Sequence, residues 1–169
     1  MNAVALRSAT LLALIATTPT ALAVTTTLTI SGRVLPGTCT LNAPAIALDP
    51  VKADELTQGD NKLKTGSLDF SGCVGVTKAT LSFAGTAADG DAERWKNTAA
   101  ADAADGVTIA LLQGATGTTY LKNGDTGIDV PVTGSTATFA LRAGYYLPTV
   151  GAAKAGAVQT EITVTADYE

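Results

Sequence analysis

The chain has 169 residues, 11 of them basic and 15 acidic, and this length suits one domain of ordinary size. A net charge of −4 without any basic block argues against nucleic acid and anionic membrane surfaces as partners. The chain contains no histidine, which excludes Ser–His and Cys–His catalytic arrangements, and we expect no enzymatic activity.

Residues 1–23 have the three-part layout of a secretory signal peptide. Arg7 precedes a short apolar run at residues 9–16, and Ala21-Leu22-Ala23 forms a small-x-small cleavage site. A membrane anchor, the alternative, needs about 20 continuous apolar residues, and this run is shorter. We therefore expect cleavage before Val24 and a mature net charge of −5, because Arg7 is the only charged residue removed.

The mature chain is predicted to begin with an uncharged arm that favours β structure. Leu28, Ile30, Gly32 and Val34 alternate with polar residues, and residues 25–31 contain neither a charge nor a proline. Free β-prone segments invite pairing with another chain. Two interpretations stay open at this point: the arm pairs within its own sheet, or it adds a strand to a second chain.

Cys39 and Cys73 are the two cysteines of the chain. In an exported protein the default for such a pair is a disulfide. The alternative, a metal site, lacks the histidine that would complete a tetrahedral ligand set. A disulfide here closes a loop of about 35 residues and contributes at most roughly 4 kcal/mol in the chain-entropy picture. We expect no metal and no other cofactor.

The rest of the chain shows short alternating apolar runs between Gly, Asp and Asn residues, a pattern typical of an antiparallel all-β domain. The apolar positions of these runs are Leu68 and Phe70; Ala79, Leu81 and Phe83; Val107, Ile109 and Leu111; Val130 and Val132; Phe139, Leu141, Ala143 and Tyr145; and Val158, Ile162, Val164, Ala166 and Tyr168. About seven strands predict a β-sandwich. Residues 89–104 depart from the pattern and predict a short helix or an irregular crossover, in which Trp95 is a packing residue rather than a ligand platform.

These features together resemble the chaperone–usher pilin family, the subunits of type 1 and P pili. At the N-terminus the matching motif is Leu28-Thr29-Ile30-Ser31-Gly32-Arg33-Val34, followed by Cys39-Thr40-Leu41 and later by Cys73. At the C-terminus the match is a spacing counted from Glu169 as the first residue. Its members, at the second, fourth, sixth, eighth and fourteenth places, are Tyr168, Ala166, Val164, Ile162 and Gly156.

The resemblance implies a fold, an all-β, incomplete immunoglobulin-like β-sandwich that lacks its last strand. A groove would then lie open beside the final strand, here residues 158–168, with the strand after Cys39 as its other wall. The chain would divide into a signal peptide at 1–23, an N-terminal donor-strand extension at 24–38 and a pilin domain at 39–169. The strand read by the chaperone would present Gly156, Ile162, Val164, Ala166 and Tyr168.

The resemblance also implies partners. A periplasmic chaperone would fill the groove first, and at an outer-membrane usher the arm of the next subunit would replace it. Leu28, Ile30, Gly32 and Val34 would enter successive pockets of that neighbour, and Gly32 would suit a shallow pocket because glycine has no Cβ. We therefore expect a structural subunit of an adhesive surface pilus, exported through the periplasm to the cell surface, as a main-shaft homopolymer. The alternatives are a minor adaptor or terminating subunit, or a free-standing secreted β-sandwich binding module.

Overall fold

The structure is a computed structural model that describes residues 25–169. The predicted signal peptide lies outside the described residues. The contacts divide the chain into two units, residues 1–33 and residues 34–169, and each is described by itself. Residues 25–33 form no regular secondary structure.

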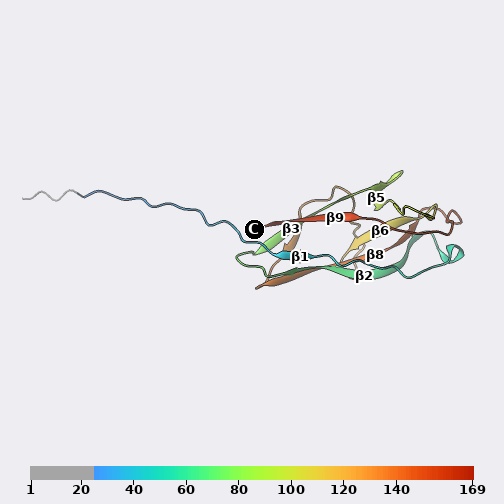
Figure 1. Cartoon of the computed structure of the whole chain (residues 1–169), viewed down its shortest axis with the longest axis horizontal. Helices are drawn as coiled ribbons and strands as arrows, with labels where there is room; N and C mark the ends of the chain where they lie inside the picture. The colour runs from blue at the N-terminus through green and yellow to red at the C-terminus, as the bar shows by residue number, and fades with distance from the viewer. Residues whose placement is uncertain (1–24) are drawn as a thin grey trace, which may run out of the picture. The chain divides into compact units, whose positions relative to one another are not determined.

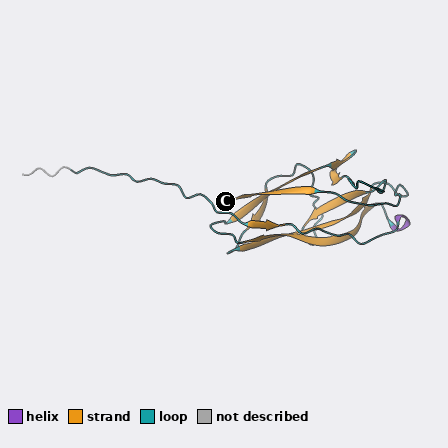
Figure 2. Ribbon diagram, in the orientation of Figure 1, coloured by secondary structure: helices purple, strands orange, loops and turns teal. Residues whose placement is uncertain are grey.

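The larger unit is built almost wholly from strands, with a single 3₁₀ turn as its helical structure (Figure 2). In chain order the elements are β1 Thr40–Asn42, η1 Ala53–Glu55, β2 Gly59–Ser71, β3 Lys78–Gly85, β4 Ala87–Ala88, β5 Asp91–Trp95, β6 Thr108–Gln113, β7 Ile128–Pro131, β8 Thr136–Leu147 and β9 Ile162–Tyr168 (Figure 1). The all-β prediction is confirmed.

The strands form two antiparallel sheets. One has six strands in the order β1-β2-β8-β6-β5-β4, and the other has three in the order β7-β3-β9. The core fills the space between them, because alternate residues of β2, β3, β6 and β8 point inward. Its buried members include Leu68, Phe70, Ala79, Leu81, Phe83, Ile109, Leu111, Val130, Phe139, Leu141 and Ala143. All of these were predicted as inward positions, and the architecture is that of an incomplete immunoglobulin-like sandwich.

The domain has two ends, which we name by what lies there. At the disulfide end, Thr40 of β1 pairs with Ser71 of β2, next to the two cysteines. At the η1 end, β2 begins at Gly59, which pairs with Leu147 of β8 shortly after the 3₁₀ turn. In Figure 1 the η1 end is on the right.

Residues 89–104 contain strand β5 and an irregular crossover. Of the two alternatives predicted for this segment, the crossover is correct and the short helix is wrong. Trp95 ends β5, is fully buried, and donates a hydrogen bond from Nε1 to the carbonyl oxygen of Leu121 at 2.8 Å. Its prediction as a packing residue is confirmed.

The final strand is shorter than predicted, since β9 begins at Ile162 and not at residue 158. The preceding residues pair with the crossover instead. The amide of Thr98 donates to the carbonyl of Gln159, and the amide of Ala104 donates to that of Ala157. Strand β3 ends at Gly85, which is opposite Ile162, so residues beyond this point need another partner.

Candidate functional site

Cys39 and Cys73 are bonded to each other, as predicted. Cys39 stands directly before β1, and Cys73 follows β2. The bond therefore continues the pairing of these two strands beyond Thr40 and Ser71. It fixes the chain immediately after the arm and the short segment that follows it.

Strand β9 has one unpaired edge. On one side it pairs with β3, and within the described chain no strand pairs with the other side. Its inward side chains, Ile162, Val164, Ala166 and Tyr168, pack on the core but stay only partly buried. In β3, which has partners on both edges, the inward side chains are fully buried. The inward face of β9 therefore lacks an apolar cover.

A cavity of about 910 Å³ runs beside this uncovered face. One wall is formed by residues 43–53, which follow β1, and the other by residues 153–164, which lead into β9. Core side chains form the floor, among them Leu68, Phe83, Ile109, Leu111 and Leu141. We call this cavity the groove. It lies between the outer edges of the two sheets, where a further strand of the sandwich would fit.

The first wall is an extended segment rather than a strand. Pro44 and Pro50 have no amide hydrogen, so a continuous ladder cannot form beyond Asn42. The wall is held by side-chain packing. A Cβ added to Gly66 of β2 would lie 2.5 Å from Cδ1 of Ile46, so this glycine makes room for the wall. The prediction of the strand after Cys39 as a wall was correct in place but not in structure.

Gly156 lies before β9 and is not part of a strand. A Cβ at this position would collide with the carbonyl of Asp102 and the amide of Ala104. The close approach lets the amide of Ala157 donate to the carbonyl of Asp102. Gly156 therefore permits the second wall to pack against the crossover, a role that the C-terminal spacing alone did not indicate.

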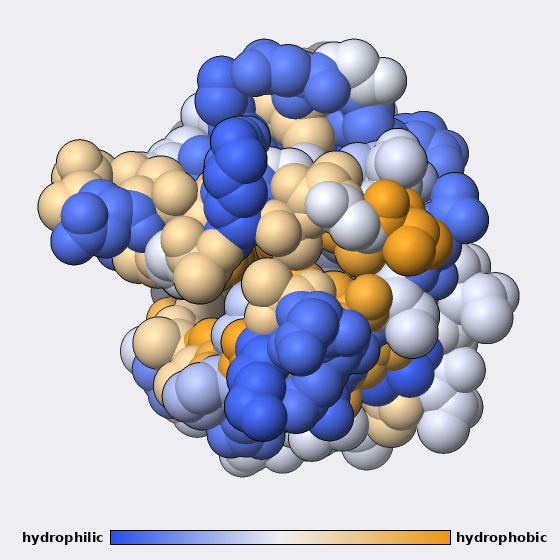
Figure 3. Space-filling view, turned by 90° about the vertical axis from the view of Figure 1, so that its right-hand side faces the viewer, coloured by the Kyte–Doolittle hydropathy of each residue, from blue (hydrophilic) through white to orange (hydrophobic). Residues whose placement is uncertain are grey.

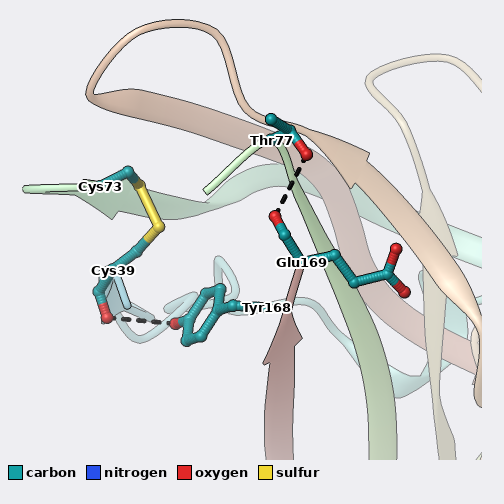
Figure 4. The surroundings of a disulfide bond; sticks show 5 residues. All are labelled: Cys39, Cys73, Thr77, Tyr168 and Glu169. Atoms are coloured by element: carbon teal, nitrogen blue, oxygen red, sulfur yellow. Dashed lines mark hydrogen bonds between the residues drawn. A yellow bond between two sulfur atoms is a disulfide. The ribbon is translucent and has the colours of Figure 1, made fainter. Parts of the chain in front are cut away.

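The groove is closed at the disulfide end. The hydroxyl of Tyr168 donates a hydrogen bond to the carbonyl oxygen of Cys39 at 3.2 Å, which joins the two sides of the groove (Figure 4). The carbonyl of Glu169 accepts from the amide and hydroxyl of Thr77 at 2.7 and 3.2 Å. Glu169 also raises the pKa of Lys78, because its carboxylate lies 3.1 Å from the ammonium group. The end of β9 is thus anchored.

The groove lining reaches the η1 end through Ala53 and Leu56 on one side and residues 153–156 on the other, and in the described chain no hydrogen bond or ion pair joins these two sides. Figure 3 looks onto this end and shows apolar surface left exposed between polar surface.

The predicted donor residues carry exposed side chains. Leu28 and Ile30 are 82% and 87% exposed, and Val34 is 97% exposed. A Cβ at Gly32 would meet nothing within 4 Å. None of the four residues lies in a strand. The apolar side chains of the arm therefore do not pack on one another within residues 25–34.

Two kinds of feature are not found in the part of the chain that the structure describes. No helix there is long and apolar enough to span a bilayer. Residues 25–169 also contain no group of three or more His, Cys, Asp or Glu side chains placed to hold a metal ion.

Comparison with known sequences decides the family. The sequence profile of the fimbrial protein family matches residues 27–169, which is nearly the whole of the described chain. The chain belongs to the fimbrial protein family. A search of curated proteins by sequence found no match.

Solved structures with a similar fold include subunits of P pili. The P pilus rod subunit PapA is similar with a TM-score of 0.63 and 17% identity, over 78% of this fimbrial chain and 99% of its own. The P pilus adaptor subunit PapF has a TM-score of 0.55 and 18% identity, over 80% and 98%. The CupB6 tip adhesin from Pseudomonas aeruginosa has a TM-score of 0.62 and 18% identity over 78% of this chain. The fimbrial chain spans 38% of the length of that adhesin.

Proposed function

We propose that this fimbrial protein is a structural subunit of a surface pilus, joined to its neighbours by donor-strand exchange. The arm of one copy, residues 24–34, fills the groove of another. The observation that carries the proposal is the partly exposed inward face of β9 beside a groove of about 910 Å³. The same chain supplies an alternating segment with exposed apolar side chains.

Lengths and energies support this pairing. Residues 24–34 equal in length the groove wall and strand formed by residues 158–168, along which side chains alternate between inward and exposed. Burying Leu28, Ile30 and Val34 contributes roughly 1.5–3 kcal/mol for each side chain. The unpaired backbone groups of β9 would gain partners, and each such group costs about 1–3 kcal/mol when it is buried unpaired.

A newly exported subunit would carry this groove open to solvent, which favours aggregation. We propose that a periplasmic chaperone covers the groove until an outer-membrane usher brings in the next subunit. The fold supports this, because it is shared with subunits of P pili. Arm and groove occur in the same chain, so copies can join without limit, as a main-shaft subunit requires. An adaptor or terminating subunit would instead be rare in purified fibres, and the abundance of the chain there distinguishes the two roles.

The test uses two variants of the mature chain. In the first, residues 24–34 are deleted, and we expect a chain that still binds the chaperone but forms no fibres. In the second, residues 24–34 are repeated after Glu169 through a short flexible linker, and we expect a stable monomer that no longer polymerises. Size-exclusion chromatography and thermal melting measure both.

A matched control carries the same grafted arm with Leu28, Ile30 and Val34 replaced by Ser. This graft should neither stabilise the domain nor block polymerisation, because its inward face is polar. The proposal fails if the deleted chain assembles normally. It also fails if both grafts behave alike, since an arm that pairs within its own sheet predicts no effect of the graft.

A further inference from the structure

The direction in which a strand enters the groove follows from the shape of the groove and rests on the function proposed above. The groove is closed at the disulfide end by the contact of Tyr168 with Cys39, and its lining on β9 stops at Val164. At the η1 end no hydrogen bond of the described chain joins the two sides of the groove, so this is the end at which a strand can enter. A donor strand followed directly by its own domain must leave that domain outside the open end. Its last residues, close to Val34, therefore lie at the η1 end.

This direction places Arg33 at the mouth of the groove. Arg33 is the only charged residue among residues 24–35. It alternates with Gly32 and Val34, whose positions point into the groove, so its side chain points out of the groove toward the rim. Since β9 runs from the η1 end toward the disulfide end, the incoming strand is antiparallel to it.

Acids lie on both sides of the mouth, and most of them are paired with a lysine. Three acids near the mouth already have a lysine partner in the described chain. The ammonium nitrogen of Lys64 lies 3.0 Å from a carboxylate oxygen of Asp49. The corresponding distance is 3.6 Å between Lys52 and Glu55 and 2.9 Å between Lys154 and Asp105. The hydrogen bond from Lys154 also lowers the pKa of Asp105, which keeps that pair charged.

Two further acids at the rim, Asp54 and Asp102, form no ion pair within residues 25–169. Asp54 follows the lining residue Ala53 on one side of the mouth. On the other side, the carbonyl of Asp102 accepts the amide of Ala157, next to the lining residue Gly156. Both residues are exposed. The mouth thus has two acids without an ion pair in the described chain, and the arm has one positive charge at the matching place.

We propose that Arg33 of an incoming second copy of this chain binds at the groove mouth beside Asp54 and Asp102, and that this contact selects the arm and sets its direction. Apolar residues fill the groove, but apolar contacts discriminate weakly among arms with similar alternation. Charges at the rim of an interface act mainly on the association rate and on the choice of partner. An arm with an acidic residue at this position meets repulsion at the open end.

The experiment measures binding of a fluorescent peptide of residues 24–35 to the mature chain. The chain is refolded at high dilution with the peptide in large excess, so that the chain's own arm does not compete. On the natural chain we expect the Arg33→Glu peptide to associate about tenfold more slowly than the natural peptide at low salt, and within about twofold at 0.5 M salt. The Arg33→Lys peptide should stay within about twofold of the natural one, because it keeps the charge.

The decisive acceptor carries Asp54→Lys and Asp102→Asn. Asn is chosen at position 102 because φ there is 47°, a left-handed conformation that Asn tolerates. On this acceptor the Arg33→Glu peptide should bind at least as fast as the natural one. The matched control is Asp89→Lys, which removes an exposed acid at the β4–β5 turn, away from the groove lining. On this control the natural peptide should still associate faster than the Arg33→Glu peptide.

The outcomes separate the two proposals. If neither peptide binds the natural chain, the donor-strand function falls, and this inference falls with it. Equal binding of both peptides to the natural chain supports the function and overturns the role of Arg33. If the Glu peptide is equally slow on the Asp54→Lys/Asp102→Asn acceptor, Arg33 acts at some other place, and the contact proposed here is wrong.

Discussion

Arg94 is a charged side chain buried on the outer face of the six-stranded sheet, only 5% exposed. Its guanidinium carbon lies 3.4 Å from the ring centre of Tyr120 and 4.0 Å from that of Tyr146. Nη1 donates to the carbonyl of Glu93 at 3.1 Å. A planar, weakly hydrated guanidinium suits a place between two aromatic rings better than an ammonium group does. Arg94 thus fastens β5 to β8 and to the loop that carries Tyr120.

We expect Arg94→Lys to lower the free energy of unfolding by about 1–3 kcal/mol, because the ammonium group cannot stack on both rings and loses more hydration when buried. The measurement is urea unfolding of the monomer with the grafted arm. Tyr146→Phe is the control, since it keeps the ring. A loss for Arg94→Lys no larger than that for Tyr146→Phe would contradict the stacking role.

Tyr120 gives the protein a dependence on alkaline pH. Burial, together with the hydrogen bond from its hydroxyl to Asp60 at 2.7 Å, raises the pKa of Tyr120 to about 12. The unfolded chain loses this proton near pH 10, so the folded state binds more protons above that pH. The stabilisation is therefore complete below pH 10 and is lost as the pH rises toward 12.

We expect the free energy of unfolding to fall between about pH 10 and 12, and to fall less steeply in Tyr120→Phe, which cannot ionise. The difference between the two pH profiles isolates Tyr120 from the lysines that titrate in the same range. Parallel profiles would show that Tyr120 has its ordinary pKa.

At the scale of the elements, alternation of apolar residues was sufficient to predict β3, β6, β8 and β9 and the second half of β2. Their inward positions form the core and the floor of the groove. Alternation did not predict the strands whose pairing depends on residues far away in the sequence. The first half of β2 is polar and contains a bulge, with φ of 49° at Lys62, yet it pairs with β8 across about eighty residues of chain.

The position of both walls of the candidate site was predicted, but the structure of only one. The inward face of β9 could be predicted from its spacing, because its residues alternate regularly. The wall after Cys39 was expected to be a strand, whereas residues 43–53 make no ladder and are held by packing such as that of Ile46 at Gly66. The stacked Arg94 was likewise not indicated, since its two rings come from separate parts of the chain.

Gly156 permits a contact between elements that a side chain would break. We expect Gly156→Val to destabilise the grafted monomer by about 1–3 kcal/mol or more, because overpacking at this contact forces the second wall away from the crossover. In the mature chain without a graft, the same substitution should also weaken binding of the 24–35 peptide, since this wall lines the mouth. The control is Gly32→Val in the N-terminal copy of the arm, because the grafted copy keeps its glycine and a Cβ at Gly32 has no neighbour within 4 Å. Unchanged stability and binding in Gly156→Val would show that the wall does not need this contact.

At the scale of the whole molecule, the proposed function makes the face of β9 the place where copies join. We expect Val164→Asp to abolish fibre formation, because a buried carboxylate in the filled groove has no partner. Thr165→Asp is the matched control, since Thr165 is exposed and points to the opposite face. Electron microscopy of cells that express each variant measures the effect. Fibres in both variants would show that the groove is not where subunits join.

The place of the disulfide determines how such a fibre would carry mechanical load. In a fibre joined as proposed, tension would reach each domain through the segment that ends at Cys39, and the bond to Cys73 would divide it between β1 and the connection from β2 to β3. The tension would leave through β9, which pairs with β3 over seven residue pairs. Because the pull runs along these strands, the ladder is loaded in shear, and its hydrogen bonds resist together instead of opening one after another. A reducing environment would remove the branch at Cys39 and load β1 alone, so a reduced fibre should yield at lower force.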